Sequence, residues 1–200
     1  MVRKTVEEIK RDDISELVVG LLGTDYLRLS IKKLTLTENY EKKTSTINCR
    51  FSENGTSPLV LKSKGCGLLD ALHCGLVEHY REKYPSLLTL TFEGFSIIPD
   101  FSKRDGSGSD AEVEVVLKFA NSQENVVTFR EVGKSFVSAS VAALFGSIEF
   151  YINAERAFRK LRKLIEEAKD RGRSDLVQGY VSKISTIVRV TSYEDVYNAV

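Results

Sequence analysis

The stretch Lys64-Gly-Cys-Gly-Leu-Leu-Asp-Ala-Leu-His-Cys-Gly75 decides how the chain is divided, because it separates β-rich segments from a helical one. On its N-terminal side, alternating apolar and polar residues predict strands. On its C-terminal side, apolar residues at helical spacing predict a helix that runs to about Tyr84, where Pro85 prevents its continuation. The stretch therefore joins the last strand of a βββ segment to a helix.

The same order of elements occurs twice. Period-2 alternation and turn residues predict six strands, at residues 26–37, 44–52, 59–62, 87–98, 111–119 and 126–132. A loop of glycine, serine and charged residues is expected at 100–110, between the fourth and fifth strands. The sequence predicts an α+β fold of duplicated βββα units (βββα-βββα), with helices packed on antiparallel sheets.

The two strand-to-helix junctions support the duplication. Gly133 precedes a helix that begins at Phe136, just as Gly65 precedes the first helix, and the two glycines are 68 residues apart. At that spacing Ala71 matches Ala139. We therefore expect the junctions to be equivalent in structure.

Helical extensions are predicted on both sides of this unit. Residues 4–22 form an amphipathic pattern, and residues 136–152 are apolar almost all round, so that helix must be sandwiched between the sheet and another layer. Helical spacing continues through the charged segment that follows. The tail predicts a short helix opening at Ser174, a strand at 184–190 and a helix cap at 192–195. We divide the chain into a helical extension (1–23), a βββα-βββα domain (24–158) and a second helical extension (159–200).

Composition narrows the class of protein. The formal net charge is +1, so the whole chain has no electrostatic signature for nucleic acid or anionic membrane, and neither partner is expected. The basic run at 156–163 is interpreted as a solvated helix face. Three sparse cysteines indicate a reducing compartment, and the charged N-terminus is unlike a signal peptide. The longest uncharged run, 135–148, is too short to span a bilayer. We expect a cytoplasmic, water-soluble protein.

Cysteine and histidine cluster in the opening stretch, but their spacing does not suit a metal. His73 and Cys74 are adjacent, so on a helix they point about 100° apart, and His79 falls on another face. A nucleophilic Cys66 needs a base, and neither histidine is placed to serve as one. We expect no metal, no cofactor, no catalytic residue and no enzymatic activity.

The glycines are more informative. Gly65 and Gly67 flank a helix start directly after a strand, which lets the backbone approach a ligand and leaves unpaired N–H groups at the positive end of the helix dipole. Such a site suits a carboxylate or a phosphate. The alternative is a tight strand-to-helix turn without a ligand. The stretch is not a P-loop, because Leu68 and Leu69 follow the last glycine where lysine and Ser/Thr are required.

Two motifs carry a family resemblance. Gly65-Cys-Gly-Leu-Leu-Asp-Ala71 resembles the G-x-G-x-x-D-A loop of the C-terminal regulatory (dimerisation) domain of 2-isopropylmalate and citramalate synthases. Ser138-Ala-Ser-Val-Ala-Ala-Leu144 resembles the start of the second helix in that domain, and the βββα-βββα order is the same. The resemblance extends from about Tyr26 to Ala157. The catalytic barrel of those synthases is larger than this whole chain, and its H-x-H metal pair is missing.

The resemblance implies a regulatory module without its enzyme. In the family, these domains form dimers around a two-fold axis and bind a branched-chain amino acid near the interface. By position, the ligand site would comprise Gly65, Gly67, Leu69, Asp70, Lys134, Ser135 and Phe136. Asp70 is assigned either to the ligand's ammonium group or to capping the helix. The expected partners are a second copy of the chain, a small amino-acid effector and a separate catalytic synthase.

Two alternatives stay open. The family usually has Asn-Gly-Pro where this chain has Cys66-Gly67-Leu68. That difference favours a dimerisation or scaffold module that binds no ligand and docks on a separate synthase. The second alternative is an enzyme that uses Cys66.

Overall fold

The computed structural model describes residues 8–9, 11–100 and 112–191. The loop predicted at 100–110 lies outside this part of the chain apart from Asp100, which ends a strand. The helix cap predicted at 192–195 also lies outside it.

Two antiparallel three-stranded meanders, each followed by a helix, confirm the predicted α+β class. The first unit comprises β2 (Leu29–Asn39), β3 (Thr44–Glu53), β4 (Leu59–Gly65) and α2 (Leu68–Tyr80). The second comprises β5 (Thr91–Asp100), β6 (Glu112–Ala120), β7 (Val126–Gly133) and α3 (Phe136–Asp170). The strands are ordered β2-β3-β4 in one sheet and β7-β6-β5 in the other. This arrangement fits a duplicated βββα unit.

The duplication extends to the hydrogen-bond register. In the first sheet, Ser45 lies opposite Gly65. In the second sheet, Val113 lies opposite Gly133, and both residues of this pair are 68 positions after their counterparts in the first. Both outer strands also carry an irregularity at the equivalent place, at residue 32 in β2 and residue 93 in β5. A β-bulge bends and twists its strand, so the two sheets share their local curvature as well as their order.

The core follows the same repeat. The buried pairs that match between the units are Ile47 with Val115, Cys49 with Leu117, Phe51 with Phe119, Leu61 with Phe129, Ala71 with Ala139 and Leu76 with Leu144. These side chains alternate along each strand, because successive residues of a strand point to opposite faces of the sheet. The inward-facing sides of both sheets therefore meet at one hydrophobic core.

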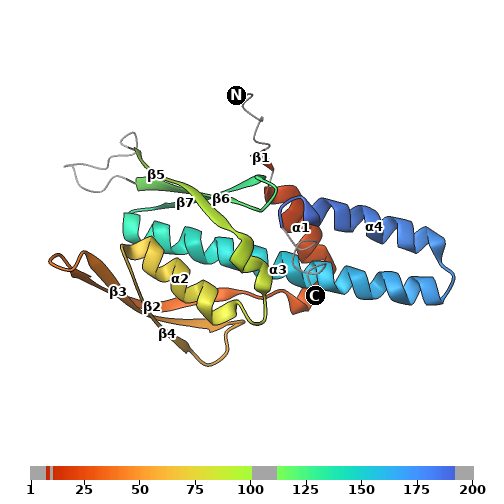
Figure 1. The fold of residues 1–200 in the computed structure, drawn as a ribbon, viewed down its shortest axis with the longest axis horizontal. Helices are drawn as coiled ribbons and strands as arrows, with labels where there is room; N and C mark the ends of the chain where they lie inside the picture. The colour runs from red at the N-terminus through yellow and green to blue at the C-terminus, as the bar shows by residue number, and fades with distance from the viewer. Residues whose placement is uncertain (1–7, 10, 101–111, 192–200) are drawn as a thin grey trace.

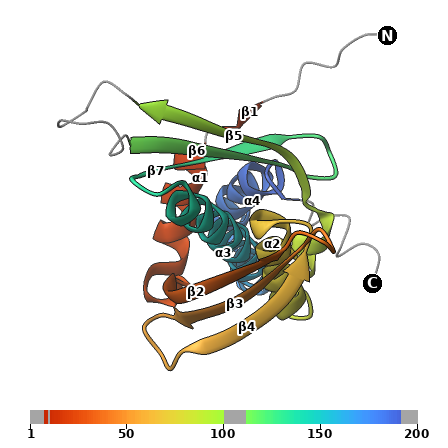
Figure 2. The ribbon, with the colours of Figure 1, turned by 90° about the vertical axis from the view of Figure 1, so that its left-hand side faces the viewer.

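Helix α3 lies at the centre of that core. Figure 2 shows it between the two sheets, with α1 (Arg11–Leu22) on one side and α2 on the other. This confirms that the apolar helix is sandwiched between a sheet and another layer, which is the second sheet. All of these layers belong to one chain, so the all-round apolarity of α3 by itself requires no second protomer.

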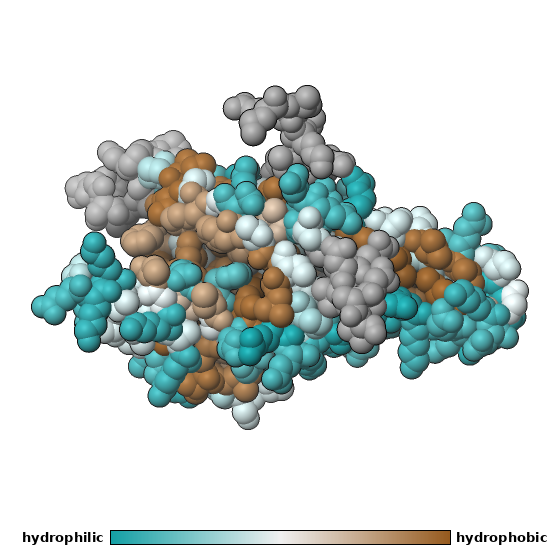
Figure 3. Space-filling model, in the orientation of Figure 1, coloured by the Kyte–Doolittle hydropathy of each residue, from teal (hydrophilic) through white to brown (hydrophobic). Residues whose placement is uncertain are grey.

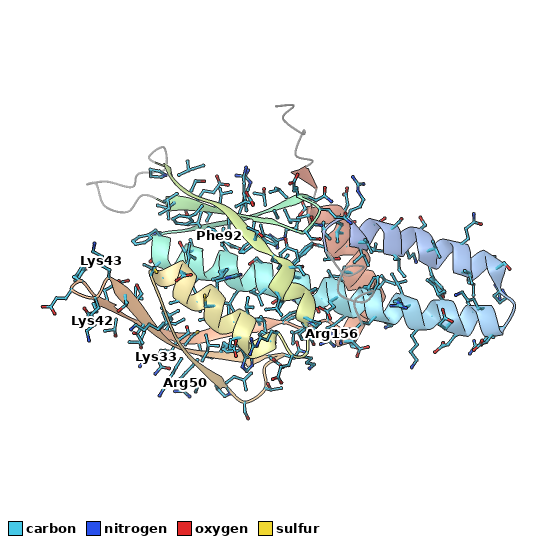
Figure 4. All side chains as sticks on the ribbon, viewed as in Figure 1. Lys33, Lys42, Lys43, Arg50, Phe92 and Arg156 are labelled. Carbon is cyan, nitrogen blue, oxygen red and sulfur yellow. The ribbon has the colours of Figure 1, made fainter. Side chains whose placement is uncertain are left out.

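Polar side chains on one face of α3 hydrogen-bond to the backbone at the start of β2 and just before it. The Asn153 side chain accepts a hydrogen bond from the Leu27 N–H at 2.8 Å and donates one to the Leu27 carbonyl at 2.8 Å. One turn earlier, Glu149 accepts from the Leu29 N–H at 2.7 Å. Arg156 donates to the Asp25 carbonyl at 2.6 Å, from the position labelled in Figure 4. The backbone here bonds to a helix, so β2 begins at residue 29 and not at 26 as predicted.

Of the N-terminal helix predicted at 4–22, residues 4–7 and 10 lie outside the described part of the chain, and helix α1 begins at Arg11. Before it, Glu8–Ile9 form the short strand β1, which pairs in parallel with Val126 and Val127 of β7. The helix prediction is wrong for these two residues. The open edge of β7 offers unpaired backbone groups, and pairing with them outweighs the helical spacing of the sequence.

The end of α2 and the start of β5 also differ from the prediction. The helix stops at Tyr80, whose carbonyl accepts from the N–H groups of Lys83 and Tyr84 in a tight turn. The residues predicted to begin the fourth strand instead form the 3₁₀ helix η2 (Pro85–Thr89). Buried Glu155 of α3 holds η2 by accepting a hydrogen bond from the Ser86 hydroxyl at 2.5 Å. This tertiary bond cannot be read from local periodicity.

The C-terminal region is a helical hairpin. Helix α3 continues to Asp170, across the boundary drawn at residues 158 and 159, and α4 (Ser174–Val188) returns beside it. Gly172, with φ of 66°, makes the turn. The strand predicted at 184–190 is wrong, because residues 184–188 belong to α4. Their β-branched side chains also fit helical spacing, and Ile187 packs into the core.

Within the described residues, α3 is the one helix whose length and composition would allow it to cross a membrane. Of its most apolar window, 67% is buried inside the fold. That degree of burial is typical of the central helix of a water-soluble protein, and it agrees with the predicted solubility.

Candidate functional site

Helices α2 and α3 begin side by side at the same end of the molecule (Figures 1 and 2). Each follows a strand that ends in a glycine, Gly65 in β4 and Gly133 in β7. The first N–H groups of any α-helix lack partners within the helix, and the aligned peptide dipoles make that end positive. The structure thus brings both halves of the sequence-predicted site to one end of the fold. We call these seven residues, Gly65, Gly67, Leu69, Asp70, Lys134, Ser135 and Phe136, the helix-start site.

The two glycines of the first motif serve different purposes. A Cβ at Gly65 would lie 2.5 Å from the Ala71 nitrogen, so packing alone requires glycine there. A Cβ at Gly67 would meet no atom within 4 Å. Gly67 is the N-cap of α2, its backbone is extended, and no side chain caps the helix from this position. The space beside Gly67 is open, as a ligand contact there would require.

Asp70 bonds back to the junction that precedes its own helix. Its carboxylate accepts a hydrogen bond from the Cys66 N–H at 2.7 Å, and the Cys74 thiol lies 3.6 Å from its second oxygen. Cys66 precedes the N-cap Gly67, so this bond stabilises the β4–α2 junction and leaves the first N–H groups of α2 without a side-chain cap. Its negative charge nevertheless stands at the exposed helix start, where it would attract an ammonium group.

The second half of the site is more exposed. Ser135 is the N-cap of α3, and its hydroxyl accepts from the Ser138 N–H at 3.3 Å. Lys134 is exposed, and the Phe136 side chain is 53% exposed. Leu69 is half-buried and packs against the core. The site therefore combines a cation, two apolar side chains and two helix starts.

The three cysteines lie in different environments. Burial raises the pKa of the Cys49 thiol to about 11, and burial together with Asp70 raises the pKa of Cys74. Cys66 is exposed. In the described ranges, no three His, Cys, Asp or Glu side chains are close enough to hold a metal ion.

Among the described residues, three side-chain polar atoms inside the fold have no hydrogen-bond partner in the structure. They are Oγ of Ser52 on β3, Nε2 of His73 in the second turn of α2 and Oγ of Ser140 in the second turn of α3. The His73 ring lies 5.6 Å from the Phe119 ring, and burial lowers its pKa. The burial of the His73 ring follows from the packing of α2 on the core. It could not be inferred from the sequence, where His73 is next to Cys74, which is exposed.

An exposed apolar strip on β5 was also not apparent from the sequence. Phe92, Phe95 and Ile97, which we call the β5 strip, are 40%, 45% and 41% exposed. They lie opposite Phe119, Leu117 and Val115, which are buried, so the strip faces the helix side of the sheet. Figure 3 shows brown apolar surface over β5, at the upper left. The edge of the second sheet therefore extends beyond the helices that cover its centre.

The first unit does not have an equally exposed edge. The residues of β2 that correspond to the strip are Ile31, Leu34 and Leu36, and they are partly buried against the core. The difference between the units reflects what covers each strand, since the alternation of residues is the same.

No family model matches the chain, and no curated protein is significantly similar to it. The resemblance to the synthase regulatory domain therefore depends on the two junction motifs and the repeated order of elements.

Proposed function

We propose that the chain is a non-catalytic regulatory and dimerisation module that binds a small branched-chain amino acid or related acid at the helix-start site. The observation that carries this proposal is the open backbone at Gly67 beside the start of α3. A ligand carboxylate would accept hydrogen bonds from the free N–H groups that follow Gly67, where the helix dipole favours negative charge.

The other groups of the site suit the rest of such a ligand. Lys134 supplies a second favourable charge for a carboxylate, and Asp70 supplies one for an ammonium group. Leu69 and Phe136 offer apolar contact to an aliphatic side chain. Leu69 and Asp70 belong to the first motif on which the family resemblance depends, and Lys134 and Phe136 lie just before the second.

Dimerisation is supported by the β5 strip. Contiguous apolar side chains at an open sheet edge favour association, because burial removes apolar surface from water and a second strand can pair with the edge. Phe136 and the strip lie in the second unit, so a dimer through this unit would form near the helix-start site. A separate catalytic synthase of branched-chain amino acid biosynthesis, in the cytoplasm, is the expected target of regulation.

A ligand-free scaffold is the second candidate. The observation in its favour is Asp70, whose carboxylate already bonds to the Cys66 N–H beside the start of α2 and would repel a ligand carboxylate. In this case the module would dimerise and dock on the synthase without sensing an effector.

A thermal-shift screen separates the two candidates. The panel comprises leucine, isoleucine, valine, their 2-oxo acids, and leucinol as the control that lacks a carboxylate. An effector at 100 times its dissociation constant stabilises the folded state by about 2.7 kcal/mol. We expect one or more of the acids to raise the melting temperature and leucinol to leave it unchanged. If no acid raises it, the scaffold candidate stands.

A further inference from the structure

The outer face of the first sheet is uniformly basic. It carries Lys33 on β2, Arg50 on β3, and Lys62 and Lys64 on β4, all exposed. Lys33 lies directly opposite Arg50, while Lys62 and Lys64 lie opposite Asn48 and Thr46. Lys42 and Lys43 add two cations at the β2–β3 hairpin, next to the exposed Glu41. We call these six residues the basic face, and Figure 4 labels four of them.

No acidic residue of the three strands balances this charge. Glu38 and Glu53, the acidic residues of β2 and β3, point to the opposite face. There they accept hydrogen bonds from the Ser45 hydroxyl at 2.8 Å and the Tyr80 hydroxyl at 2.7 Å. Across the described residues, none of the six cations forms an ion pair with a neighbour. Their charge is therefore available to a partner.

Placing these cations close together lowers the stability of the sheet locally, and the fold itself does not require it. Like charges directly opposite each other on adjacent strands are destabilising, and Lys33 and Arg50 form such a pair. Lysines on edge strands commonly serve only to prevent strand pairing between molecules. That explanation suits Lys33, Lys62 and Lys64, but it does not suit Arg50, which is on the central strand.

Whole-chain charge conceals this concentration. Residues 29–65 contain seven lysines and arginines against three glutamates, a net charge of +4, in a chain whose net charge is +1. The expectation that the protein has no nucleic-acid partner was based on the chain-wide balance. A sheet face with this charge creates a local positive potential that the average does not report.

The residues between the cations indicate the partner's chemistry. Thr35, Thr37, Thr46 and Asn48 are exposed on the same face, and hydroxyl and amide groups of this kind bond to phosphate and sugar oxygens. Lys62 and Lys64 are two residues apart on one strand, which separates them by about 7 Å. The one large apolar side chain on the strands of this face is Val60, 57% exposed, and Tyr40, 88% exposed, lies at the hairpin beside Lys42 and Lys43.

We propose that the basic face binds the phosphodiester backbone of a nucleic acid, without reading its sequence. A protein partner would need an apolar interface centre depleted of charge, which this face lacks. An anionic membrane would be favoured by a cluster of apolar side chains that insert among the lipids, and Val60 on β4 and Tyr40 at the hairpin are two separate side chains, one of them with a polar hydroxyl. Nucleic-acid interfaces, in contrast, are polar, wet and strongly positive. This inference is independent of the effector site.

Fluorescence anisotropy with labelled single-stranded and duplex oligonucleotides of mixed sequence tests the proposal on the full chain. We expect binding to at least one form that weakens steeply with salt, because each neutralised phosphate releases counterions. The variant Arg50→Glu/Lys62→Glu should lose at least about tenfold in affinity, and its salt slope should be shallower by about 1 to 2. Glu at residue 50 would lie opposite Lys33 with the opposite charge, so the fold should be retained. Arg50→Gln/Lys62→Gln is a second variant with a smaller expected loss.

The matched control is Lys163→Glu/Arg171→Glu, which makes the same change in net charge on the exposed far end of the α3–α4 hairpin. It should bind within about twofold of the wild type, because these charges lie far from the contacted phosphates. The proposal is overturned if the wild type binds neither oligonucleotide at low salt, or if the control loses as much affinity as the Arg50/Lys62 variants. Binding to phosphatidylserine vesicles without binding to oligonucleotides would also overturn it.

Discussion

Gly65 and Ala71 approach each other so closely that a Cβ on Gly65 would lie 2.5 Å from the Ala71 nitrogen and 2.8 Å from its Cα. The last residue of β4 is thereby packed against the first turn of α2. A Cβ at the matching Gly133 would make only an ordinary 3.6 Å contact with Ala139. The two junctions are equivalent in sequence position, but only the first depends on glycine.

Replacing Gly65 with alanine should destabilise the fold by about 2 kcal/mol, because the added Cβ meets backbone atoms that cannot rotate away. Urea unfolding measures the change. Gly133→Ala is the matched control, and it should remain within about 0.5 kcal/mol of the wild type. Equal losses at the two positions would show that the close approach is not the cause.

Glu155 should be important for stability, because it is fully buried and bonds both Ser86 in η2 and Arg159 on its own helix. Glu155→Ala would leave the Ser86 N–H and hydroxyl without their partner, which should cost about 2 kcal/mol in urea unfolding. Glu155→Gln retains an acceptor and should cost less. The exposed pair of Glu166 and Lys169 provides the control, since Glu166→Ala should have an effect below about 0.5 kcal/mol.

Stability should decrease as the pH falls below about 6.5, in part because of His73. Burial holds the folded-state pKa of His73 below its ordinary value of 6.5. The unfolded chain then binds more protons than the folded one in this range, so the His73 contribution is complete above pH 6.5 and is lost on acidification, by at most about 1.4 kcal/mol per pH unit. Melting temperatures between pH 7 and pH 5 should decrease less in His73→Leu than in the wild type.

The β5 strip should carry the dimer contact. Phe95→Asp/Ile97→Asp introduces two charges on this strip and should shift the protein to monomer in sedimentation velocity. Val181→Asp places a charge on another exposed apolar side chain, 51% exposed on α4, and should leave the wild-type state unchanged. A wild type that sediments only as a monomer would contradict dimerisation. A wild-type dimer that persists in the β5 variant would place the contact elsewhere.

The repeated fold was predictable because each unit carries its own local signals. Alternation along β3 and β6 places Phe51 and Phe119 at matching buried positions, and a glycine ends each third strand. These signals depend only on residues close in sequence. Where local signals conflict with tertiary bonds, the sequence prediction was wrong: β1 pairs with β7, and residues 184–188 pack as a helix against α3.

The surfaces were less predictable than the core. The residues of the helix-start site could be named from the sequence, and the structure places both halves at one end of the fold. Neither the β5 strip nor the basic face could be named from the sequence. Phe95 of the strip and Leu34 of β2 occupy equivalent positions in the two units, and they differ only in which parts of the fold cover them. Likewise, Arg50, Lys62 and Lys64 share a face only once the strand register is known.

Effector binding by the Gly67→Val variant tests the central claim most directly. The wild type and the variant are titrated calorimetrically with the acid that gives the largest thermal shift, and both are examined by sedimentation. Gly67 has an extended backbone and open space beside it, so valine should fit without disturbing α2. Its branched side chain would occupy the position expected for the ligand carboxylate. The account predicts that the wild type binds the acid and that Gly67→Val does not, with the oligomeric state and the unliganded melting temperature nearly unchanged. Wild-type affinity in Gly67→Val would contradict the account, because the ligand would then bind away from the start of α2.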